Sequence, residues 1–483
     1  DHALGLTANN VYAGLEGFYL LTSPAFEAQF RLPAGSYEIP LVFQDRDIQT
    51  NCAPASLLYN GVPFHHLATV NGVVMPYLEV EPRRYRFRIL DGANYRTFGL
   101  NALAPNGTNL PFYVIGNEAG FLQQTVTNTA LNMMPGERLD VIMDFSAFAG
   151  ANVTLVSQVG NAIPATAPAI SNLLQFRVVL PLKGTDTSVI PTVIVPTNEW
   201  VTTARMVEEA TVHRQITLDL ANAIPFPGPP FVSPEGSPFA LLNLSFFDDP
   251  ITEFPAAGST EVWSLINLTS EAHPIHVHLL DFRVVDRIRF AGFSGSLSRT
   301  NPPSGVVNYI TDRQTDRLKP LATYLGTNAV AALPFESGPK DVVRVAPYSV
   351  TRIVMTWPSD PIFYTSPSAR NLDPATAGRY IFHCHLLEHE DDDMMRPLQL
   401  VAPWPKLNWV VDPTVNPGAN NSLRFSVLTV THGAYRMEST PSLDWATWLP
   451  GELILGTGGP VEVTPPPSQT PALHYRIRPV PRP

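Results

Sequence analysis

The sequence has few cysteines, no long apolar run and no cluster of basic residues. Only two of its 483 residues are cysteines, Cys52 and Cys384, too few for a disulfide framework. We expect Cys52 to be a small buried hydrophobe. The apolar stretches are short and interrupted by proline, glycine or charge, so we predict no membrane-spanning helix. The formal net charge is -11 without a Lys/Arg-rich run, which argues against nucleic acid or an anionic membrane as partner.

The start of the chain and its glycosylation triplets bear on where the protein is found. No secretory signal is visible and the first residue is Asp1, which predicts a processed or truncated end. Five Asn-x-Ser/Thr triplets are compatible with a glycosylated, secreted protein, located outside the cell or at a cell or spore surface. These triplets begin at Asn106, Asn152, Asn243, Asn267 and Asn420.

Stretches with a helical period are scarce, whereas short alternating segments recur along the chain. YRFRIL at 85–90, DVIMDF at 140–145 and RIVMTW at 352–357 each place successive side chains on opposite sides of a sheet. The 49 prolines and 30 glycines spread between such segments are typical of turns that join short strands. The pattern predicts an all-β protein built of sandwiches or barrels.

A faint internal repeat divides the chain. RFRILDGANYRTFGL and MPGERLDVIMDF are matched later by EVWSLINLTSEAHPIHVHLL and APYSVTRIVMTW, each pair running from a strand through an Asn-containing turn to a Pro-led loop. We predict two related β-sandwich domains, residues 30–189 and 190–403. Residues 1–29 include an expected apolar strand, GLEGFYLL, and are interpreted as the remnant of an earlier domain. Residues 404–483 are Pro-rich and lack a clear period, so we expect a C-terminal extension that is partly disordered or wrapped over the surface.

The segment YIFHCHLLEHEDDDM gathers metal-binding side chains in a chain that has only 12 histidines. In a strand, Cys384 points to one face while His383 and His385 point to the other, so one strand reaches two sites. His389 and Met394 follow closely enough for the chain to turn back to the thiolate side. Thiolate, imidazole and a distant thioether are ligands of a blue copper site, which needs a second histidine.

The segment HPIHVHLL offers that histidine and more. His273 is separated from the other two histidines by two residues and can face the thiolate site, completing a set of two His, one Cys and one Met. His276 and His278 then remain with the two histidines beside Cys384, four imidazoles without an acid or thiolate, which suits a cluster of copper ions. A structural zinc site would close four ligands into one tetrahedron, and ligands split across two strand faces disfavour it.

Both histidine segments resemble a known family. HPIHVHLLDF and HCHLLEHEDDDMM look like the two C-terminal copper motifs of the multicopper oxidases. VNGVVMPYLEVEPRRYRFRILDGANYRTFGL, PGERLDVIMDF and EHEDDDMMRP are similar to the branch that holds spore-coat laccase, bilirubin oxidase and phenoxazinone synthase. The likeness covers the chain as far as the predicted extension. It implies three cupredoxin-like Greek-key domains, of which this chain would hold two complete and lack most of the first.

The resemblance implies a role for each motif position. The type 1 copper would be held by His273, Cys384, His389 and Met394. The type 2 copper would take His276, and the type 3 pair would take His2, His278, His383 and His385. His2 would be the second His of a His-x-His pair, and the family's remaining cluster ligands would precede Asp1. A docked N-terminal fragment of the same protein would then be needed for up to four copper ions.

The resemblance also implies a path for electrons and protons. Cys384 would collect electrons from a small aromatic donor and deliver them through its neighbours His383 and His385, where O2 is reduced to water. Glu390 matches an acidic position implicated in proton supply in the spore-coat laccases. Its alternative is a solvated place in the acidic run from Glu388 to Asp393. These four residues, Cys384, His383, His385 and Glu390, are the candidate catalytic residues.

Three functions are open for the chain. The first is a laccase-like oxidase that couples one-electron oxidation of phenols, aminophenols or tetrapyrroles to the reduction of O2. The second is a blue copper electron carrier that uses only the type 1 site, and the third is an inactive structural or coat protein. The retained imidazoles favour the first, because buried imidazoles without partners are costly and a carrier does not need them. For the 483 residues alone we expect poor O2 reduction.

Overall fold

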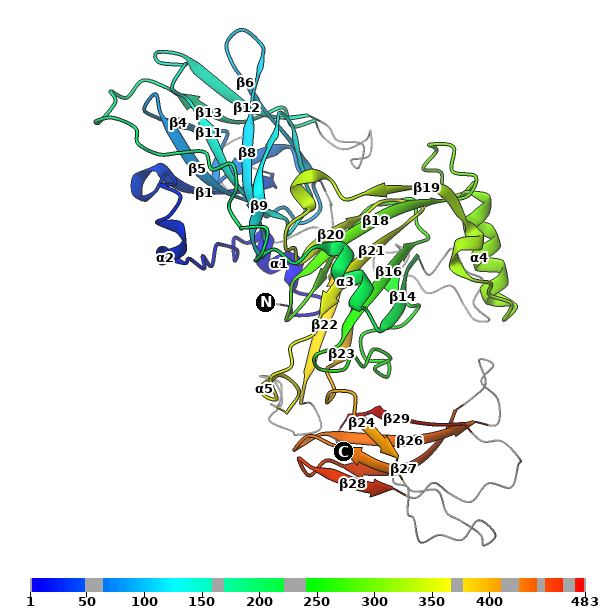
Figure 1. Ribbon diagram of the computed structural model, residues 1–483. Helices are drawn as coiled ribbons and strands as arrows, with labels where there is room; N and C mark the ends of the chain where they lie inside the picture. The colour runs from blue at the N-terminus through cyan, green and yellow to red at the C-terminus, as the bar shows by residue number, and fades with distance from the viewer. Residues whose placement is uncertain are drawn as a thin grey trace, which may run out of the picture.

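The computed structural model shows three β-rich bodies that follow one another along the molecule (Figure 1). It describes residues 2–47, 64–158, 169–220, 240–365, 377–409, 425–440, 448–463 and 474–481. Cys52 and Asn420 lie outside these ranges, so what we expect of them stays a prediction. Membrane spans are absent from the helices of these ranges, the longest of which has 11 residues.

The first sandwich packs a seven-stranded sheet against a six-stranded sheet. The larger sheet has the order β3 (Val73–Val74), β2 (Leu67–Val70), β1 (Glu38–Arg46), β5 (Arg84–Asp91), β11 (Arg138–Asp144), β8 (Phe112–Asn117) and β9 (Gly120–Asn128). The smaller has the order β10 (Leu131–Met133), β6 (Phe98–Leu103), β12 (Asn152–Gln158), β13 (Asn172–Arg177) and β4 (Tyr77–Glu79), with β7 (Asn109–Leu110) beside β6. The alternation in β5 buries Phe87 and Ile89 in the core, while Arg86 on the other face is held by Asp140.

The second sandwich combines a six-stranded sheet with a four-stranded one. The larger sheet has the order β15 (Ala240–Leu242), β14 (Val212–Leu220), β16 (Thr260–Asn267), β21 (Ser349–Thr356), β18 (Phe282–Phe290) and β19 (Leu325–Ala331). The smaller has the order β20 (Val342–Val345), β17 (His273–Val277), β22 (Arg379–Cys384) and β23 (Met395–Gln399). Trp263 and Trp357 fill the core between them. Both histidine segments therefore lie on the two central strands of the smaller sheet.

The two sandwiches share the arrangement of their central strands. In the first, β1 is parallel to β5, which is antiparallel to β11. In the second, β14 is parallel to β16, which is antiparallel to β21. The segments paired by the sequence repeat therefore occupy equivalent places. The domain boundaries themselves, at 30–189 and 190–403, stay a prediction.

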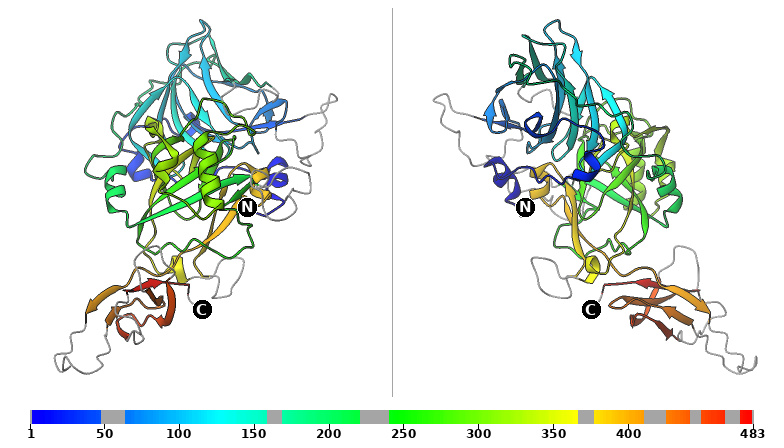
Figure 2. Two further views of the ribbon diagram at one scale, coloured as in Figure 1. Left: turned by 90° about the vertical axis from the view of Figure 1, so that its right-hand side faces the viewer. Right: turned by 60° about the vertical axis from the view of Figure 1, so that its left-hand side comes forward.

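The N-terminal segment contacts both sandwiches, the second near its start and the first at Glu27, which pairs with Arg86 of β5. It contains α1 (Thr7–Tyr12) and α2 (Pro24–Glu27), and α1 contacts α6 (Leu387–Asp391), which follows β22 (Figure 2). The Asp391 carboxylate accepts hydrogen bonds from the N–H groups of Thr7 and Ala8 at 3.0 and 2.8 Å. The expected strand GLEGFYLL does not form within the described residues, because its apolar side chains find no sheet and Tyr19 is 89% exposed.

Short helices connect the strands of the two sandwiches. They are η1 (Gly35–Tyr37), α3 (Thr203–Glu209), α4 (Ser304–Gln314), η3 (Leu321–Tyr324), η4 (Pro334–Glu336) and α5 (Ile362–Thr365). Tyr309 of α4 and Tyr324 of η3 pack edge to face at 5.2 Å, which fixes α4 on the flank of the second sandwich (Figure 1).

The C-terminal extension contains regular sheets where the sequence showed no period. One sheet has the order β24 (Lys406–Trp409), β25 (Phe425–Leu428) and β28 (Pro460–Val463), and the other has the order β27 (Leu449–Leu455), β26 (Ala434–Thr440) and β29 (His474–Pro479). Tyr435 and Met437 share a hydrophobic core with Leu400 and Ala402 of the second sandwich. The described residues thus form strands of four to seven residues where the Pro-rich composition led us to expect an extension partly disordered or wrapped over the surface.

Candidate metal centre

Strands β17 and β22 bring the two histidine segments together. They pair antiparallel, with Ile275 opposite Cys384 and His276 opposite His383. Because side chains alternate along a strand, His273 and Cys384 share one face while His276 and His383 share the other. The division of ligands between two faces, predicted from the sequence, is therefore present in the sheet.

The first face carries three ligand atoms at the corners of a small triangle. Cys384 Sγ lies 3.6 Å from His273 Nδ1 and 3.9 Å from His389 Nδ1, and the two nitrogens are 3.3 Å apart. A point equidistant from all three lies about 2.1 Å from each, close to the ~2.0–2.3 Å that imidazole nitrogen and thiolate sulfur keep from a first-row metal ion. The three residues could hold one such ion in a trigonal arrangement.

Two local features orient this triangle. Thr269 Oγ1 lies 2.8 Å from His273 Nε2, which leaves Nδ1 of that ring directed at the thiol. The short helix α6 begins three residues after Cys384 and returns His389 to the same face. Met394 N–H donates to His389 O at 2.7 Å and Met394 O accepts from Cys384 N–H at 2.9 Å, so Met394 is fixed beside both ligands and is fully buried.

The electrostatics of the triangle suit a cation. Burial raises the pKa of the Cys384 thiol well above its usual range, so a thiolate here needs a positive charge beside it. Burial and, to a lesser degree, Arg299 lower the pKa of His389 to about 4, and burial also lowers that of His273. Both imidazoles are thus neutral at neutral pH and free to donate a lone pair to a metal ion.

The opposite face gathers three more imidazoles. The ligand nitrogens of His2, His278 and His383 all lie within 4.8 Å of one another, and the Nε2 atoms of His278 and His383 are 3.4 Å apart. The His2 ring centroid is 4.6 Å from that of His278 and 4.3 Å from that of His383. The docking of α1 on α6 therefore carries His2 from the far end of the chain into one group with two sheet residues.

His276 and His385 lie beside this group without completing another. The His276 ring is 4.7 Å from His278 and 6.1 Å from His385. His276 Nδ1 donates to Asp341 O at 2.7 Å, which leaves Nε2 for a metal ion. The Nδ1 atom of His385 is buried and makes no hydrogen bond to any described residue, as expected of a ligand atom.

On this face, every imidazole with a shifted pKa has a lowered one. Burial, followed by the neighbouring imidazoles, lowers the pKa of His278 to about 2. Burial and His383 lower the pKa of His385 to about 4, and the pKa of His276 falls well below its usual range for the same reasons. A group of neutral imidazoles with little acid among them suits copper ions.

Glu390 is the acid that contacts this group. It is buried, with Oε1 2.6 Å from His2 Nδ1 and Oε2 3.1 Å from His383 Nδ1. Burial opposes its ionisation, but His383 and His2 outweigh burial and hold the pKa of the carboxyl below its usual range. The solvated alternative for Glu390 is therefore wrong. The carboxylate orients His2 by a hydrogen bond, whereas His383 Nδ1 donates to Cys384 O at 2.9 Å.

Sequence reasoning missed the residues that surround the outer edge of His389. Tyr95, from the first sandwich, donates to Glu271 Oε2 at 2.8 Å, and its hydroxyl lies 3.4 Å from His389 Nε2. Glu271 Oε2 is 3.7 Å from the same nitrogen, and Oε1 of the same carboxylate is paired with Arg299. Glu271 stands two residues before His273, so its place in the motif was the only available signal.

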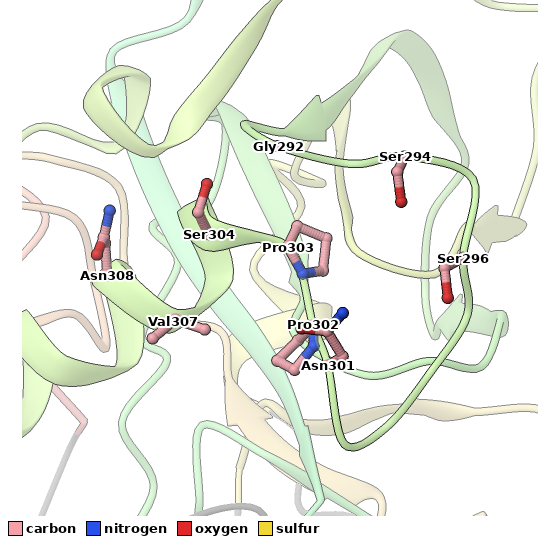
Figure 3. A pocket seen from close by; sticks show the side chains of 9 residues that line it. All are labelled: Gly292, Ser294, Ser296, Asn301, Pro302, Pro303, Ser304, Val307 and Asn308. Carbon is pink, nitrogen blue, oxygen red and sulfur yellow. The ribbon is translucent and has the colours of Figure 1, made fainter.

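Two cavities lie near the centre. One of about 900 Å³ is bordered by the N-terminal segment and by both sandwiches, and His276 and His278 open into it. The other, of about 390 Å³, lies inside the loop from Gly292 to Pro303 at the start of α4, where Ser294, Ser296 and Asn301 face it (Figure 3). The same loop carries Arg299, so it links the second cavity to the outer edge of His389.

Comparison with known proteins identifies relatives of the chain. A protein-family model described as multicopper oxidase matches residues 242–364 and 368–401, which contain both histidine segments. The chain is 34% identical over 423 residues to the laccase of Bacillus subtilis, covering 83% of this chain and 70% of that protein. It is 33% identical over 451 residues to the laccase of Haloferax volcanii, covering 89% of this chain and 64% of that protein. The crystal structure of the McoA multicopper oxidase of Aquifex aeolicus has the same fold, with a TM-score of 0.60 and 23% identity over 82% of this chain and 74% of that one.

The fold and the site thus define a copper-binding oxidoreductase made of cupredoxin-like Greek-key sandwiches. The chain belongs to the multicopper oxidase family. Its likeness to the Bacillus subtilis laccase covers 83% of the chain.

Proposed function

We propose that the chain is a laccase-like oxidase that takes single electrons from phenolic, aminophenolic or tetrapyrrole donors and uses them to reduce O2 to water. In this proposal His273, Cys384 and His389 hold the type 1 copper with Met394 as distant ligand. Copper bound at the two sites would supply the one-electron oxidation and the reduction of O2. Every other role belongs to side chains of the chain itself.

The pairing of β17 with β22 is the observation that carries this proposal. It puts the three-atom triangle of Cys384 on one face and the imidazoles of His276 and His383 on the other. One peptide unit separates Cys384 from each of its histidine neighbours. A site that only bound a metal ion would have no need of a second group of imidazoles one residue away.

The surroundings of His389 support donors that lose a proton on oxidation. His389 Nε2 points away from the triangle toward Tyr95 and Glu271. A phenol bound there would place its hydroxyl within reach of the Glu271 carboxylate, which is about one-quarter exposed. Glu271 Oε2 can accept the phenolic proton as the donor gives up its electron.

Glu390 supports the supply of protons on the opposite face. Its carboxylate contacts His2 and His383, so a proton passing to this face can be relayed through Oε1 or Oε2, which hold it only transiently because the two imidazoles keep the pKa of the carboxyl low. We further propose that a docked N-terminal fragment supplies additional imidazoles to His276 and His385.

A second function is favoured by one specific observation. The triangle of His273, Cys384 and His389 is complete within the described residues, whereas His276 and His385 belong to no group of three close ligand atoms there. The 483 residues by themselves would then act as a blue copper electron carrier.

Copper content and the visible spectrum test the proposal. We expect an intense blue thiolate absorption that Cys384→Ser abolishes, and nearly four copper ions per chain where an N-terminal fragment co-purifies. About one copper with the blue band and no fragment would favour the carrier. A chain that gains neither colour nor copper on reconstitution would contradict both functions.

We also propose an extracellular or surface location for the protein. Two triplets support it, because the side chains of Asn106 and Asn152 are exposed. Asn267 is fully buried and its amide donates to Glu271 O, Val345 O and Ala346 O, so a glycan there is incompatible with the fold. A mass loss at Asn106 or Asn152 on enzymatic deglycosylation of the native protein would support the location, and an unmodified chain from its own source would count against it.

A further inference from the structure

A tight turn of the first sandwich reaches into the second at the metal centre. Glu137 N–H donates to Met134 O at 3.0 Å across the turn, with Pro135 at the second position and Gly136 at the third. Gly136 has φ +82°, so these four residues form a type II turn between β10 and β11. The sequence MPGE has the residues that this turn type prefers.

The turn is anchored in the second sandwich at its beginning and its end. Met134 is 2% exposed and belongs to the hydrophobic core of the second sandwich. Glu137 Oε1 lies 3.4 Å from Lys340 Nζ, which Glu118 also binds, at 2.8 Å. All three charged side chains are buried, so removing one would leave a buried charge without compensation.

Arg138, directly after the turn, connects it to His276. Its guanidinium binds both carboxylate oxygens of Asp341 at 2.7 Å. The backbone oxygen of Asp341 accepts the hydrogen bond from His276 Nδ1 at 2.7 Å. The fork of Arg138 therefore fixes the residue that orients the His276 ring.

Gly136 connects the same turn to His385. A Cβ at Gly136 would lie 2.5 Å from His385 Cδ2 and 2.7 Å from its Nε2, distances that side chains do not tolerate. The His385 ring thus rests directly on the backbone of the turn. Only glycine combines the positive φ of this position with room for the ring.

We propose that the turn Met134–Arg138 is a positioning device that sets the rings of His276 and His385 for metal binding. The inference rests on the proposed function only in taking these two histidines as ligands. In this arrangement the first sandwich supplies no ligand from its described residues. It acts through one turn, which couples the docking of the two sandwiches to the geometry of the copper cluster.

Gly136→Ala, with Gly150→Ala as control, tests the contact with His385. Gly150 has φ +79°, and a Cβ added there would meet no atom within 4 Å, so both substitutions strain the backbone equally but only one displaces a ring. The metal-free full chain is titrated with Cu(II), with non-blue copper followed by EPR spectroscopy and the blue absorption as internal reference. We expect Gly136→Ala to weaken the affinity for non-blue copper ~10–100-fold, while Gly150→Ala leaves this affinity unchanged. Both variants should keep the blue band.

Combining the substitutions at Gly136 and His385 distinguishes an effect on the position of the His385 ring from general destabilisation of the fold. In a His385→Ala background the substitution Gly136→Ala should have no further effect on non-blue copper, because the displaced ring is absent. Equal copper affinities for the two glycine variants would overturn the proposal. So would a chain that binds no non-blue copper, and in that case a surviving blue band would leave the mononuclear site of the proposed function intact.

Substitutions of Arg138 provide an independent test of the proposal. Arg138→Ala should weaken non-blue copper and Arg138→Lys should restore only part of it, since lysine keeps the charge but loses the fork. Arg352→Ala on β21 removes a comparable pair with Asp286 of β18 and serves as control for lost charge. An Arg138→Ala chain that unfolds at a lower temperature yet binds non-blue copper as before would show a purely structural role and overturn the inference.

Discussion

At the scale of single residues, the proposed function places the entry of electrons from the donor at the outer edge of His389. Glu271 Oε2 is the only carboxylate oxygen among the described residues recorded within 4 Å of His389 Nε2. We expect Glu271→Gln to slow the bleaching of the blue band by phenols about 100-fold, because the amide cannot take up the phenolic proton. A neutral ferrocene, which releases no proton, should bleach both proteins at similar rates. The measurement is anaerobic stopped-flow absorption.

Glu209→Gln is the matched control for this prediction. Glu209 is an exposed carboxylate paired with Arg205 on α3, so it reports on the loss of one negative charge alone. Equal slowing of phenols and ferrocene by Glu271→Gln would contradict proton uptake and would point to a change in the mononuclear site itself.

The grouping of His273, Cys384 and His389 was predictable because these residues lie in two short segments. Alternation along a strand separates Cys384 from His383, and the interval of five residues to His389 allows one turn of chain. The role of Glu390 could not be read from the acidic run, because burial depends on α6 packing against the N-terminal segment. Tyr95 and Gly136 were out of reach, since a tyrosine and a glycine carry no signal until two sandwiches dock.

At the scale of elements, the N-terminal segment is held by a carboxyl group that titrates near neutral pH. Burial raises the pKa of Glu16 to about 7 from its ordinary 4.5, only partly opposed by the Gln44 amide, which donates to Oε2 at 3.0 Å. Between these values the folded chain keeps a proton that the unfolded chain releases. The contribution to stability is therefore complete below the unfolded value and is lost as the pH rises toward 7.

Glu16→Gln should remove this pH dependence. We expect the variant to raise the free energy of unfolding by about 2 kcal/mol at pH 8 and by much less at pH 5, because the amide cannot ionise. Urea unfolding at the two pH values measures both effects. The same gain at both values would contradict the raised pKa, and a gain only at pH 5 would reverse its sign.

Element lengths also explain where sequence reasoning stopped in the extension. Strands such as β25 and β28 have four residues each, too few for an alternating pattern to exceed chance. Their stability comes instead from the shared core, in which Val427 and Val463 join residues of the second sandwich. Contacts of this kind depend on how distant parts of the chain pack together, so the local sequence does not predict them.

At the scale of the whole molecule, β22 contributes to two groups of ligand atoms, one on each face. The group on the Cys384 face is complete, and the group on the opposite face is only partly complete. His2, His278 and His383 form a close group, while His276 and His385 stand beside it within the described ranges. We expect the copper-loaded chain to be bleached by a donor under nitrogen but to regain its blue colour slowly in air, since reduction of O2 needs four electrons from neighbouring metal ions. Stopped-flow mixing of the bleached chain with oxygenated buffer measures the return of colour.

His385→Ala distinguishes slow reoxidation at the mononuclear site from turnover at the cluster. If the cluster is idle in this chain, the variant regains its colour at the same slow rate as the unaltered protein. If the unaltered chain recolours fast and His385→Ala abolishes the fast phase, the prediction is wrong and the imidazoles present suffice. The imidazoles beside the cavity at His276 and His278 would then need no further ligand from a docked fragment. The chain itself would complete the path of electrons from Cys384 to O2.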